Sequence, residues 1–188
     1  WIQQHAPGQR EKDDKTPLTV ADLAAQAIVA SALERAFPDV PLVAEEDSSA
    51  LSGDAGRRLA EQTLEFVRPL LPALTRADLE RLLNTGAGSP ANRFWTLDPI
   101  DGTKGFLRGG HYVVSLALIE DYQPTVAMIG CPTLNPAGLD GGTGGLVMVA
   151  RRGCGTWVSP IGASEFETVR VSEARSLNDA WMLQSVAE

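Results

Sequence analysis

The sequence contains too few cysteines and histidines for several common kinds of functional site. Its two cysteines, Cys131 and Cys154, do not make a disulfide framework or a zinc site, and we expect both to be reduced, buried thiols in an intracellular protein. Its two histidines, His5 and His111, do not sit near a Ser or Cys in a recognisable nucleophile motif. Catalysis by a Ser or Cys triad therefore has little support.

The chain also lacks an apolar run of membrane-spanning length, and its polar start is broken by Pro7 and Gly8, unlike a signal peptide. We therefore expect a cytoplasmic protein without a membrane partner. Positive charge is scarce as well, since 16 Lys and Arg against 24 Asp and Glu leave a net charge of −8. An acidic surface repels polynucleotides, so we expect no nucleic acid polymer as a partner. A bound cation would still allow a small phosphorylated substrate.

The first half of the 188-residue chain carries helical patterns. Residues 1–14 are polar, and we expect them to form a mobile N-terminal segment. An apolar helical stripe begins after Thr19 and closes at Phe37. Residues 54–84 predict one or two helices interrupted by prolines, with Leu70 on the apolar face of the first.

Short apolar runs bounded by turn residues predict strands, at residues 42–44, 94–97, 113–120, 125–131, 145–151, 156–159, 168–171 and 181–186. We expect the turn between the third and fourth of these runs at Asp121–Pro124. Helices followed by strands predict an α+β fold, a layered α/β sandwich with a largely antiparallel sheet. The first residue is Trp1 rather than Met, and the last predicted strand runs nearly to the chain end. We therefore expect that the sheet continues into residues outside this chain.

Two separate predicted strands end in acidic residues. Glu45-Glu46-Asp47 follows the first strand, and Asp98 with Asp101 follows the second. Strand ends are rigid places from which ligands can converge, and carboxylate oxygens are what Mg²⁺ prefers. Without cations, converging carboxylates would repel one another and raise their own pKa values. The pattern therefore favours a site for hard cations.

The segment Asp98–Thr103 has further features that suit phosphate chemistry. Pro99 forces a turn after the strand, so two acids three residues apart can face one site, with the Ile100 carbonyl as another ligand. Gly102 permits close backbone approach, and a helix starting at about Thr103 would offer amide groups to a phosphate and a hydroxyl to a water. Activation of a water by metal beside a bound phosphate is the apparatus of phosphate-ester hydrolysis.

Each feature taken alone also has a simpler interpretation. Asp-Gly and Asp-Pro pairs are turn signals, and an acidic cluster such as residues 45–47 is more often a solvated helix start. Asp22 alone suits the dipole of a helix first turn, and Lys104 and Arg108 alone are more often surface residues. Only the combination of these features, in this order, supports a metal-dependent phosphatase.

In that combination the chain resembles the lithium-sensitive, Mg²⁺-dependent phosphatase superfamily of inositol monophosphatase and fructose-1,6-bisphosphatase. Asp14–Asp22 resembles the entry motif of the 3′(2′),5′-bisphosphate nucleotidases, and Trp95–Gly109 resembles their central motif. The Lys-Gly-Phe-Leu-Arg-Gly continuation at 104–109 favours that branch, because inositol monophosphatases typically have Thr-Asn-Phe there. The similarity continues through residues 115–119 and 129–132.

The resemblance implies the metal ligands for two or three Mg²⁺ ions in the complete enzyme: Glu45, Asp98, Asp101 and the Ile100 carbonyl. Asp98 would bridge two of the ions. Asp22 and Thr103 would orient and deprotonate the attacking water, and the amides of Gly102 and Thr103 would bind the substrate phosphate.

The activity that the resemblance implies is that of a phosphomonoesterase, a hydrolase that removes the 3′-phosphate of 3′-phosphoadenosine 5′-phosphate to give AMP and phosphate. Some family members also accept 3′-phosphoadenylyl sulfate. The family has a second half with a Trp-Asp-x-x-Ala-Gly motif, which nothing in residues 110–188 matches. We therefore expect residues 15–188 to be the N-terminal metal-binding domain, one half of an αβαβα sugar-phosphatase fold, with the missing C-terminal half as its partner.

Two alternatives stay open. An inositol-phosphate or sugar-phosphate phosphatase would share every metal ligand, so the metal site cannot separate it from a nucleotidase. The chain could also be an inactive fragment that acts only as a metal- or partner-binding module. Because the third motif is missing, we expect residues 1–188 alone to have very little activity.

Overall fold

The computed structural model describes residues 9–11, 17–85, 92–134 and 144–179. The strand predicted at 181–186 and the start of the entry motif lie outside these residues. Within the N-terminal segment that we expected to be mobile, β1 (Gln9–Glu11) pairs antiparallel with β2 (Pro17–Thr19). The sequence did not predict this pairing, because β1 is entirely polar and has no alternating pattern.

Helix α2 (Val20–Ala36) begins and ends as predicted, with Thr19 as its N-cap and Phe37 as its C-cap. The Thr19 hydroxyl accepts hydrogen bonds from the amides of the first turn, and the Asp22 carboxylate accepts one from the Thr19 amide at 2.8 Å. This reciprocal capping box holds the start of the helix. Every residue from Val20 to Ala27 is buried, which is typical of a helix with protein on all sides.

Two further helices cover α2, as the pattern over residues 54–84 predicted. They are α3 (Gly53–Val67) and α4 (Arg76–Thr85), and both contact α2. The prediction for Leu70 is wrong, since this side chain is 68% exposed. The cause is that α3 ends at Val67, so Leu70 lies in the following turn and no longer shares the helical face.

The described residues form one seven-stranded sheet in the order β3-β4-β5-β6-β7-β8-β9. The strands are β3 (Leu42–Ala44), β4 (Arg93–Asp101), β5 (Val113–Glu120), β6 (Gln123–Cys131), β7 (Leu146–Arg151), β8 (Gly155–Pro160) and β9 (Glu167–Val169). Only β3 and β4 are parallel, and all other neighbours are antiparallel. The predicted α+β fold with a largely antiparallel sheet is confirmed.

Several strand boundaries differ from the predictions, among them those of β4, β6 and β9. The strand expected to end at Asp98 continues to Asp101, after a shift in its register with β5. The turn before β6 consists of Asp121 and Tyr122, which have φ angles of 49° and 61°, so Gln123 already belongs to the strand. β9 is shorter than expected and ends at Val169. These limits depend on pairing with neighbours, which local composition does not determine.

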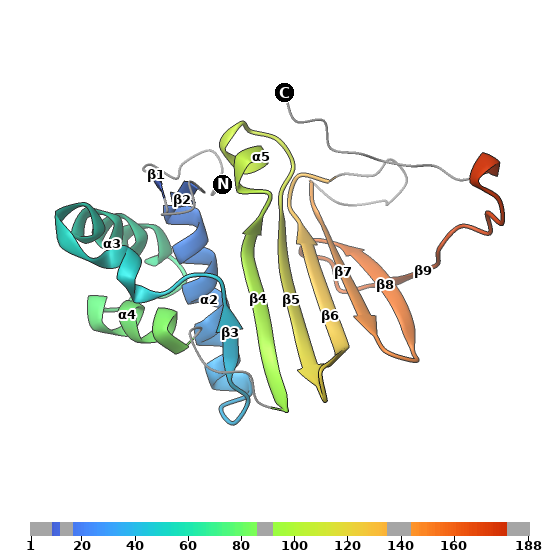
Figure 1. The fold of residues 1–188 in the computed structure, drawn as a ribbon, viewed down its shortest axis with the longest axis horizontal. Coiled ribbons are helices and arrows are strands. Elements are labelled where there is room, and N and C mark those ends of the chain that lie inside the picture. Colours follow the sequence, from blue (N-terminus) through green and yellow to red (C-terminus); the bar gives the residue numbers. More distant parts are fainter. Residues whose placement is uncertain (1–8, 12–16, 86–91, 135–143, 180–188) are drawn as a thin grey trace.

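The main core lies between the helices and the β3–β5 part of the sheet. Figure 1 shows α2 beside β4, with α3 and α4 on its far side, while β6 to β9 extend away from the helices. On β6, the neighbouring side chains of Met128 and Ile129 point to opposite faces and are 37% and 39% exposed. Apolar surface is therefore open on both faces of this part of the sheet.

Two predictions about single properties have separate outcomes. Cys131 is a buried free thiol as expected, but Cys154 is exposed, because it lies in the turn between β7 and β8 rather than in a strand. In the part of the chain that the structure describes, no helix is long and apolar enough to cross a membrane.

Candidate metal centre at the ends of β3 and β4

The parallel pairing of β3 and β4 brings the two acidic segments to the same edge of the sheet. Ala44, the last residue of β3, is paired with Leu97. The next residues along the two strands are Glu45 and Asp98. Because the carboxyl ends of parallel strands meet at one edge, the predicted convergence of two strand-end acids follows from this register.

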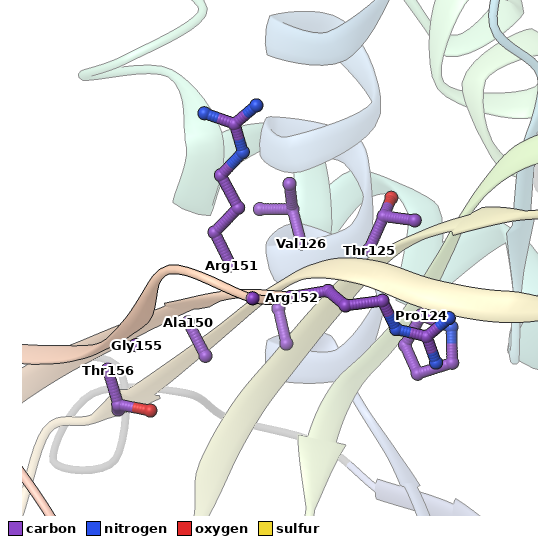
Figure 2. A pocket seen from close by; sticks show the side chains of 10 residues that line it. Pro124, Thr125, Val126, Ala150, Arg151, Arg152, Gly155 and Thr156 are labelled. Atoms are coloured by element: carbon purple, nitrogen blue, oxygen red, sulfur yellow. The ribbon is translucent and has the colours of Figure 1, made fainter.

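A hollow elsewhere in the sheet offers no comparable arrangement. It has a volume of about 440 Å³ and is lined by residues of β6, β7 and β8. Its lining residue Val126 pairs with Leu118, which pairs with Trp95 near the start of β4, so the hollow lies toward the opposite end of the sheet from Asp98. Figure 2 shows that Arg151 and Arg152, its two cationic side chains, extend in different directions. They do not converge on one ligand.

Asp98 lies at the centre of the acidic residues. Burial raises the pKa of its carboxyl group above the ordinary value, and the negative charges of Glu45 and Asp101 raise it further. Asp22, from α2, has a smaller effect in the same direction. The structure therefore places the other three carboxylates that the sequence nominated within electrostatic reach of Asp98: Asp22 on α2, Asp101 at the end of β4 and Glu45 directly after β3.

The Asp98 carboxylate also contains an unsatisfied atom. Its Oδ1 is buried and has no hydrogen-bond partner among the described residues. A buried carboxylate oxygen without a donor is costly, and a neighbouring cation would satisfy it. The Asp98 carboxylate therefore fits a hard divalent cation on the chemistry of its own oxygen and of its neighbours.

The four carboxylates are near one another without forming a finished ligand cage. Within residues 17–85, 92–134 and 144–179, no group of three or more His, Cys, Asp or Glu side chains is close enough to hold a metal ion. Glu45 and Asp101 are exposed, while Asp22 is buried. Like charges without a counter-ion repel one another, which opposes a closer approach of these carboxylates.

The backbone after Asp98 is supported by a small apolar cluster. Ile100 is buried together with Phe106 and Tyr112, against Ala21 and Ala25 of α2. The two aromatic rings make an edge-to-face contact with centroids 5.0 Å apart. This cluster attaches the Asp98–Thr103 segment to the same helix that carries Asp22.

Gly102 connects β4 to the short helix α5 (Thr103–Leu107). It has a φ of 88°, a left-handed conformation that glycine adopts without strain. The Thr103 hydroxyl donates a hydrogen bond to the Ile100 carbonyl at 3.0 Å. The carbonyl has a second lone pair, so this bond leaves the predicted role of Ile100 as a ligand open.

The glycines after Thr103 have a geometric role. A Cβ at Gly105 would lie 2.5 Å from the backbone oxygen of His111, which real side chains do not tolerate. The Gly105 carbonyl in turn accepts a hydrogen bond from the Gly110 amide at 2.8 Å. The chain after α5 thus folds back closely over the segment that carries Gly102.

Asp22 has a local structural task as well as its place near Asp98. Its Oδ2 accepts hydrogen bonds from the Thr19 amide at 2.8 Å and from the Thr19 hydroxyl at 2.5 Å. The simpler interpretation of Asp22 as a first-turn charge is therefore correct, and it coexists with the electrostatic contact to Asp98.

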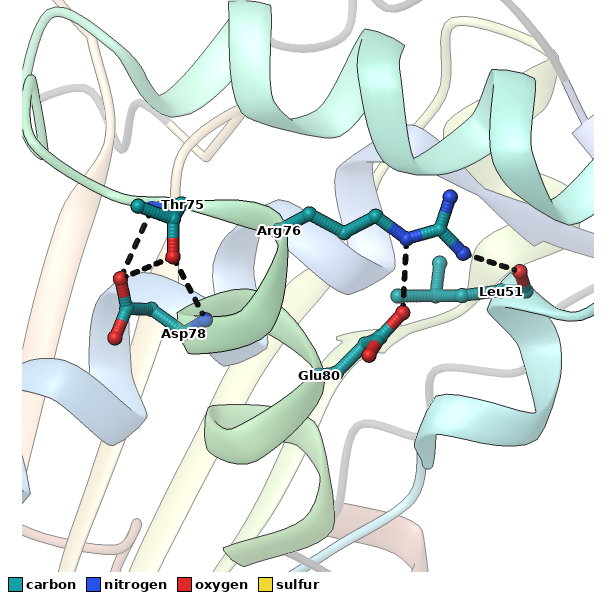
Figure 3. Close-up of polar contacts among 5 residues, drawn as sticks. All are labelled: Leu51, Thr75, Arg76, Asp78 and Glu80. Carbon is teal, nitrogen blue, oxygen red and sulfur yellow. Dashed lines mark hydrogen bonds and ion pairs between the residues drawn. The ribbon is translucent and has the colours of Figure 1, made fainter.

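The segment that follows Glu45, residues 46–51, is held by its own Asp47 and by Arg76 of α4. Asp47 caps the 3₁₀ helix η1 (Ser48–Leu51), and hydrogen bonds from Ser49 lower the pKa of its carboxyl group. At the far end, Arg76 of α4 donates to the Leu51 carbonyl at 3.2 Å while it pairs with Glu80 (Figure 3). The acidic segment is thus tied to the helical layer rather than loose in solvent.

Sequence reasoning missed one buried polar residue in this region. Gln26 of α2 is fully buried, and its side chain makes two hydrogen bonds to the backbone of Glu46. The available signal was a lone amide in an alanine-rich helical stretch, four residues after Asp22 and so on the same helical face.

Comparison with known proteins adds a family assignment to this geometry. The sequence profile described as the inositol monophosphatase family matches residues 2–188. A protein of Schizosaccharomyces pombe named 3′(2′),5′-bisphosphate nucleotidase is 43% identical over 139 residues, with coverage of 69% of this chain and 39% of the relative. A protein of Arabidopsis thaliana named 3′(2′),5′-bisphosphate nucleotidase 1 is 34% identical over 197 residues, with coverage of 94% and 56%.

The fold is also found in solved structures. An IMPase of Thermotoga maritima aligns with a TM-score of 0.54 at 21% identity, over 94% of this chain and 48% of that protein. The extragenic suppressor protein suhB of Bartonella henselae aligns with a TM-score of 0.52 at 22% identity, over 92% and 47%. The chain thus spans about half the length of these structures, and 39% and 56% of the two curated relatives.

Proposed function

The chain belongs to the inositol monophosphatase family, and on that premise we propose that the full-length protein is a magnesium-dependent phosphomonoesterase acting on 3′-phosphoadenosine 5′-phosphate. The observation that carries the proposal is Asp98, whose buried and unpartnered Oδ1 lies among the charges of Glu45, Asp101 and Asp22. Such a carboxylate cluster favours binding of hard cations, and cations make a phosphate ester reactive toward water.

The metal would be held by oxygen ligands from the two strand ends: Glu45, Asp98, Asp101 and the Ile100 carbonyl. When bound, Mg²⁺ supplies charge neutralisation for the phosphate and acidity for a nearby water. The negative charges of the other three carboxylates all act on Asp98, so we propose that this residue would contact more than one ion.

The remaining groups would handle the water and the phosphate. The single proton of the Thr103 hydroxyl is donated to the Ile100 carbonyl, so its oxygen is left to accept a hydrogen bond from a water. Asp22 would accept a proton from that water, in the direct in-line attack that we propose. The amides of the exposed Gly102 and the half-buried Thr103 would donate to the substrate phosphate.

The nucleotide substrate follows from the named relatives and the 104–109 continuation. Removal of the 3′-phosphate would give AMP and phosphate, and 3′-phosphoadenylyl sulfate would be a second substrate. The deciding experiment measures phosphate release by the full-length protein from 3′-phosphoadenosine 5′-phosphate and from inositol 1-phosphate, with Mg²⁺ and with added lithium. We expect preference for the nucleotide and inhibition by lithium. Preference for the inositol ester would overturn the substrate assignment.

We also propose that residues 15–188 form the N-terminal domain and that a further segment of the full-length protein packs on β6 to β9. The relatives extend well beyond the matched region, and this part of the sheet exposes apolar side chains. They include Met128, Ile129, Ile161, Phe166 and Val169. Such surface is typical of an interface. Residues 1–188 alone should therefore show very little turnover, and substantial activity of this fragment would refute the proposal.

A further inference from the structure

The side chain of Gln26 holds the backbone beside Glu45 at two points. Its Nε2 donates to the Glu46 carbonyl at 2.6 Å, and its Oε1 accepts from the Glu46 amide at 3.0 Å. The two residues are 20 positions apart, and both are buried, at 0% and 4% exposure. A single amide side chain thus satisfies both backbone groups of one residue in the acidic segment.

These two hydrogen bonds take the place of strand pairing just beyond the end of β3. The pairing of β3 with β4 ends at Ala44 and Leu97, two residues before Glu46. Buried backbone groups beyond that point need partners, and Gln26 provides a donor and an acceptor in the spacing of a neighbouring strand. The two simultaneous hydrogen bonds restrict the peptide groups on both sides of the Glu46 Cα, and the first of these groups joins Glu46 to Glu45. They therefore restrict the direction in which the adjacent Glu45 carboxylate leaves the backbone.

The same helix face carries Asp22, one turn before Gln26. Residues four apart in a helix lie on one side of it, so the capping carboxylate and the clamping amide move as one body. Asp22 acts electrostatically on Asp98, while Gln26 fixes the backbone next to Glu45. Helix α2 therefore adds to the β3–β4 pairing in fixing the spacing between the acid after β3 and those at the end of β4.

We propose that Gln26 is a positioning residue for the metal centre, which aligns the Glu45 carboxylate with Asp98 by clamping the Glu46 backbone. The proposal rests on the proposed function, since it needs a cation site at these acids. Groups that orient metal ligands typically affect metal affinity about 10- to 100-fold when removed. Gln26 is not among the groups that we predict to handle the water or the phosphate, so its effect should fall on Mg²⁺ affinity more than on turnover at saturating Mg²⁺.

The test compares full-length Gln26→Leu and Gln26→Glu with Thr63→Val. Thr63 is also fully buried and donates one hydrogen bond, to the Leu59 carbonyl within α3, so its variant loses a buried hydrogen bond away from the acids. Gln26→Leu removes both contacts, whereas Gln26→Glu keeps the volume and an acceptor for the Glu46 amide. If Gln26→Leu does not fold, Gln26→Glu carries the test.

Mg²⁺ binding is measured by calorimetry without substrate, and kcat is measured at saturating Mg²⁺. We expect the Gln26 variants to bind Mg²⁺ about 10- to 100-fold more weakly, with kcat within a few-fold of wild type, and Thr63→Val to bind Mg²⁺ normally. Mg²⁺ affinity within twofold of wild type, or a loss equal to that of Thr63→Val, would overturn the inference alone. Failure of the wild-type protein to bind Mg²⁺ would overturn the proposed function together with it.

Discussion

The two acidic segments at the candidate metal centre are held in different ways. The segment after β3 depends on side chains that are distant in the sequence: Gln26 binds Glu46, and Arg76 binds the Leu51 carbonyl. The segment Asp98–Thr103, at the end of β4, depends on its own backbone and its near neighbours, through the left-handed Gly102 and the contacts of Ile100. One segment is therefore supported by long-range polar contacts, and the other by local geometry and apolar packing.

This difference separates two kinds of sensitivity. We expect loss of a polar clamp to change metal affinity more than stability, because the clamp orients a ligand while other contacts hold the helices together. Loss of local geometry or apolar packing costs folding free energy directly. Substitutions on the first segment should therefore lower metal affinity, whereas substitutions on the second should lower the free energy of unfolding. The following experiments test that distinction, starting with the largest expected effect.

Asp98→Asn should have the largest effect, because it removes the carboxylate on which both segments converge. We expect kcat/KM of the full-length enzyme to fall by roughly 10³-fold or more, since electrostatic groups of this kind dominate transition-state stabilisation. The measurement is phosphate release at saturating Mg²⁺. Near-normal turnover would contradict the assignment of Asp98.

In the metal-free protein, Asp98→Asn should raise the melting temperature, although it lowers the activity of the metal-bound enzyme. The folded-state pKa of Asp98 is raised, chiefly by burial, so the stability that its protonated form contributes is present at low pH and is lost as pH rises through that pKa. Asparagine stays neutral, so metal-free Asp98→Asn should melt at a higher temperature than wild type at neutral pH, with the difference shrinking in acid. A lower melting temperature at neutral pH would show that the carboxylate is not destabilising there.

Phe106→Ala tests the apolar support of the second segment. Phe106 is 4% exposed and packs edge-to-face on Tyr112, so its loss should lower the free energy of unfolding by about 3–5 kcal/mol. Urea unfolding of the full-length protein measures this, with Mg²⁺ affinity determined on the folded fraction. A large loss of Mg²⁺ affinity with little change in stability would remove the distinction between the segments.

Gly105→Ala should cost less, about 1–3 kcal/mol, because a Cβ at this position lies 2.5 Å from the His111 backbone oxygen and forces the chain to shift. Gly109→Ala is the matched control. Gly109 has a φ of 73° but nothing within 4 Å of an added Cβ, so it reports conformational strain without a clash. Equal unfolding free energies for the two variants would show that the close approach at Gly105 is unimportant.

The contrast between the segments also explains what the sequence could predict. The segment at the end of β4 is local: the residue types of Gly102 and Thr103 predicted a close backbone approach and a helix start. The turn predicted at Pro99 is wrong, because β4 continues through this residue to Asp101. The β3 and β4 acids could be nominated because each follows an apolar run. Thr19 and Asp22 predicted the start of α2 because a helix cap depends on residues that lie within four positions of one another.

The remainder depends on contacts between distant residues. Nothing near Gln26 indicates that it binds Glu46, because that pairing exists only after α2 has packed beside β3. The continuation of β4 to Asp101 and the exposure of Leu70 likewise depend on where pairing and helices end in three dimensions. The roles of individual ligands, Asp22 and Thr103 included, stay predictions that the experiments above address.

Asn84→Ala should have the smallest effect and serves as an exposed counterpart of the buried Gln26 contact. The Asn84 Oδ1 accepts a hydrogen bond from the Ser48 amide at 3.3 Å, so it touches the first acidic segment from α4, but at an exposed position. Water can replace an exposed partner, so we expect the free energy of unfolding to change by about 0.5 kcal/mol or less. Mg²⁺ affinity, measured by calorimetry, should stay within twofold of wild type. A loss as large as that of Gln26→Glu would mean that any contact to this segment tunes the metal centre, and that burial does not set Gln26 apart.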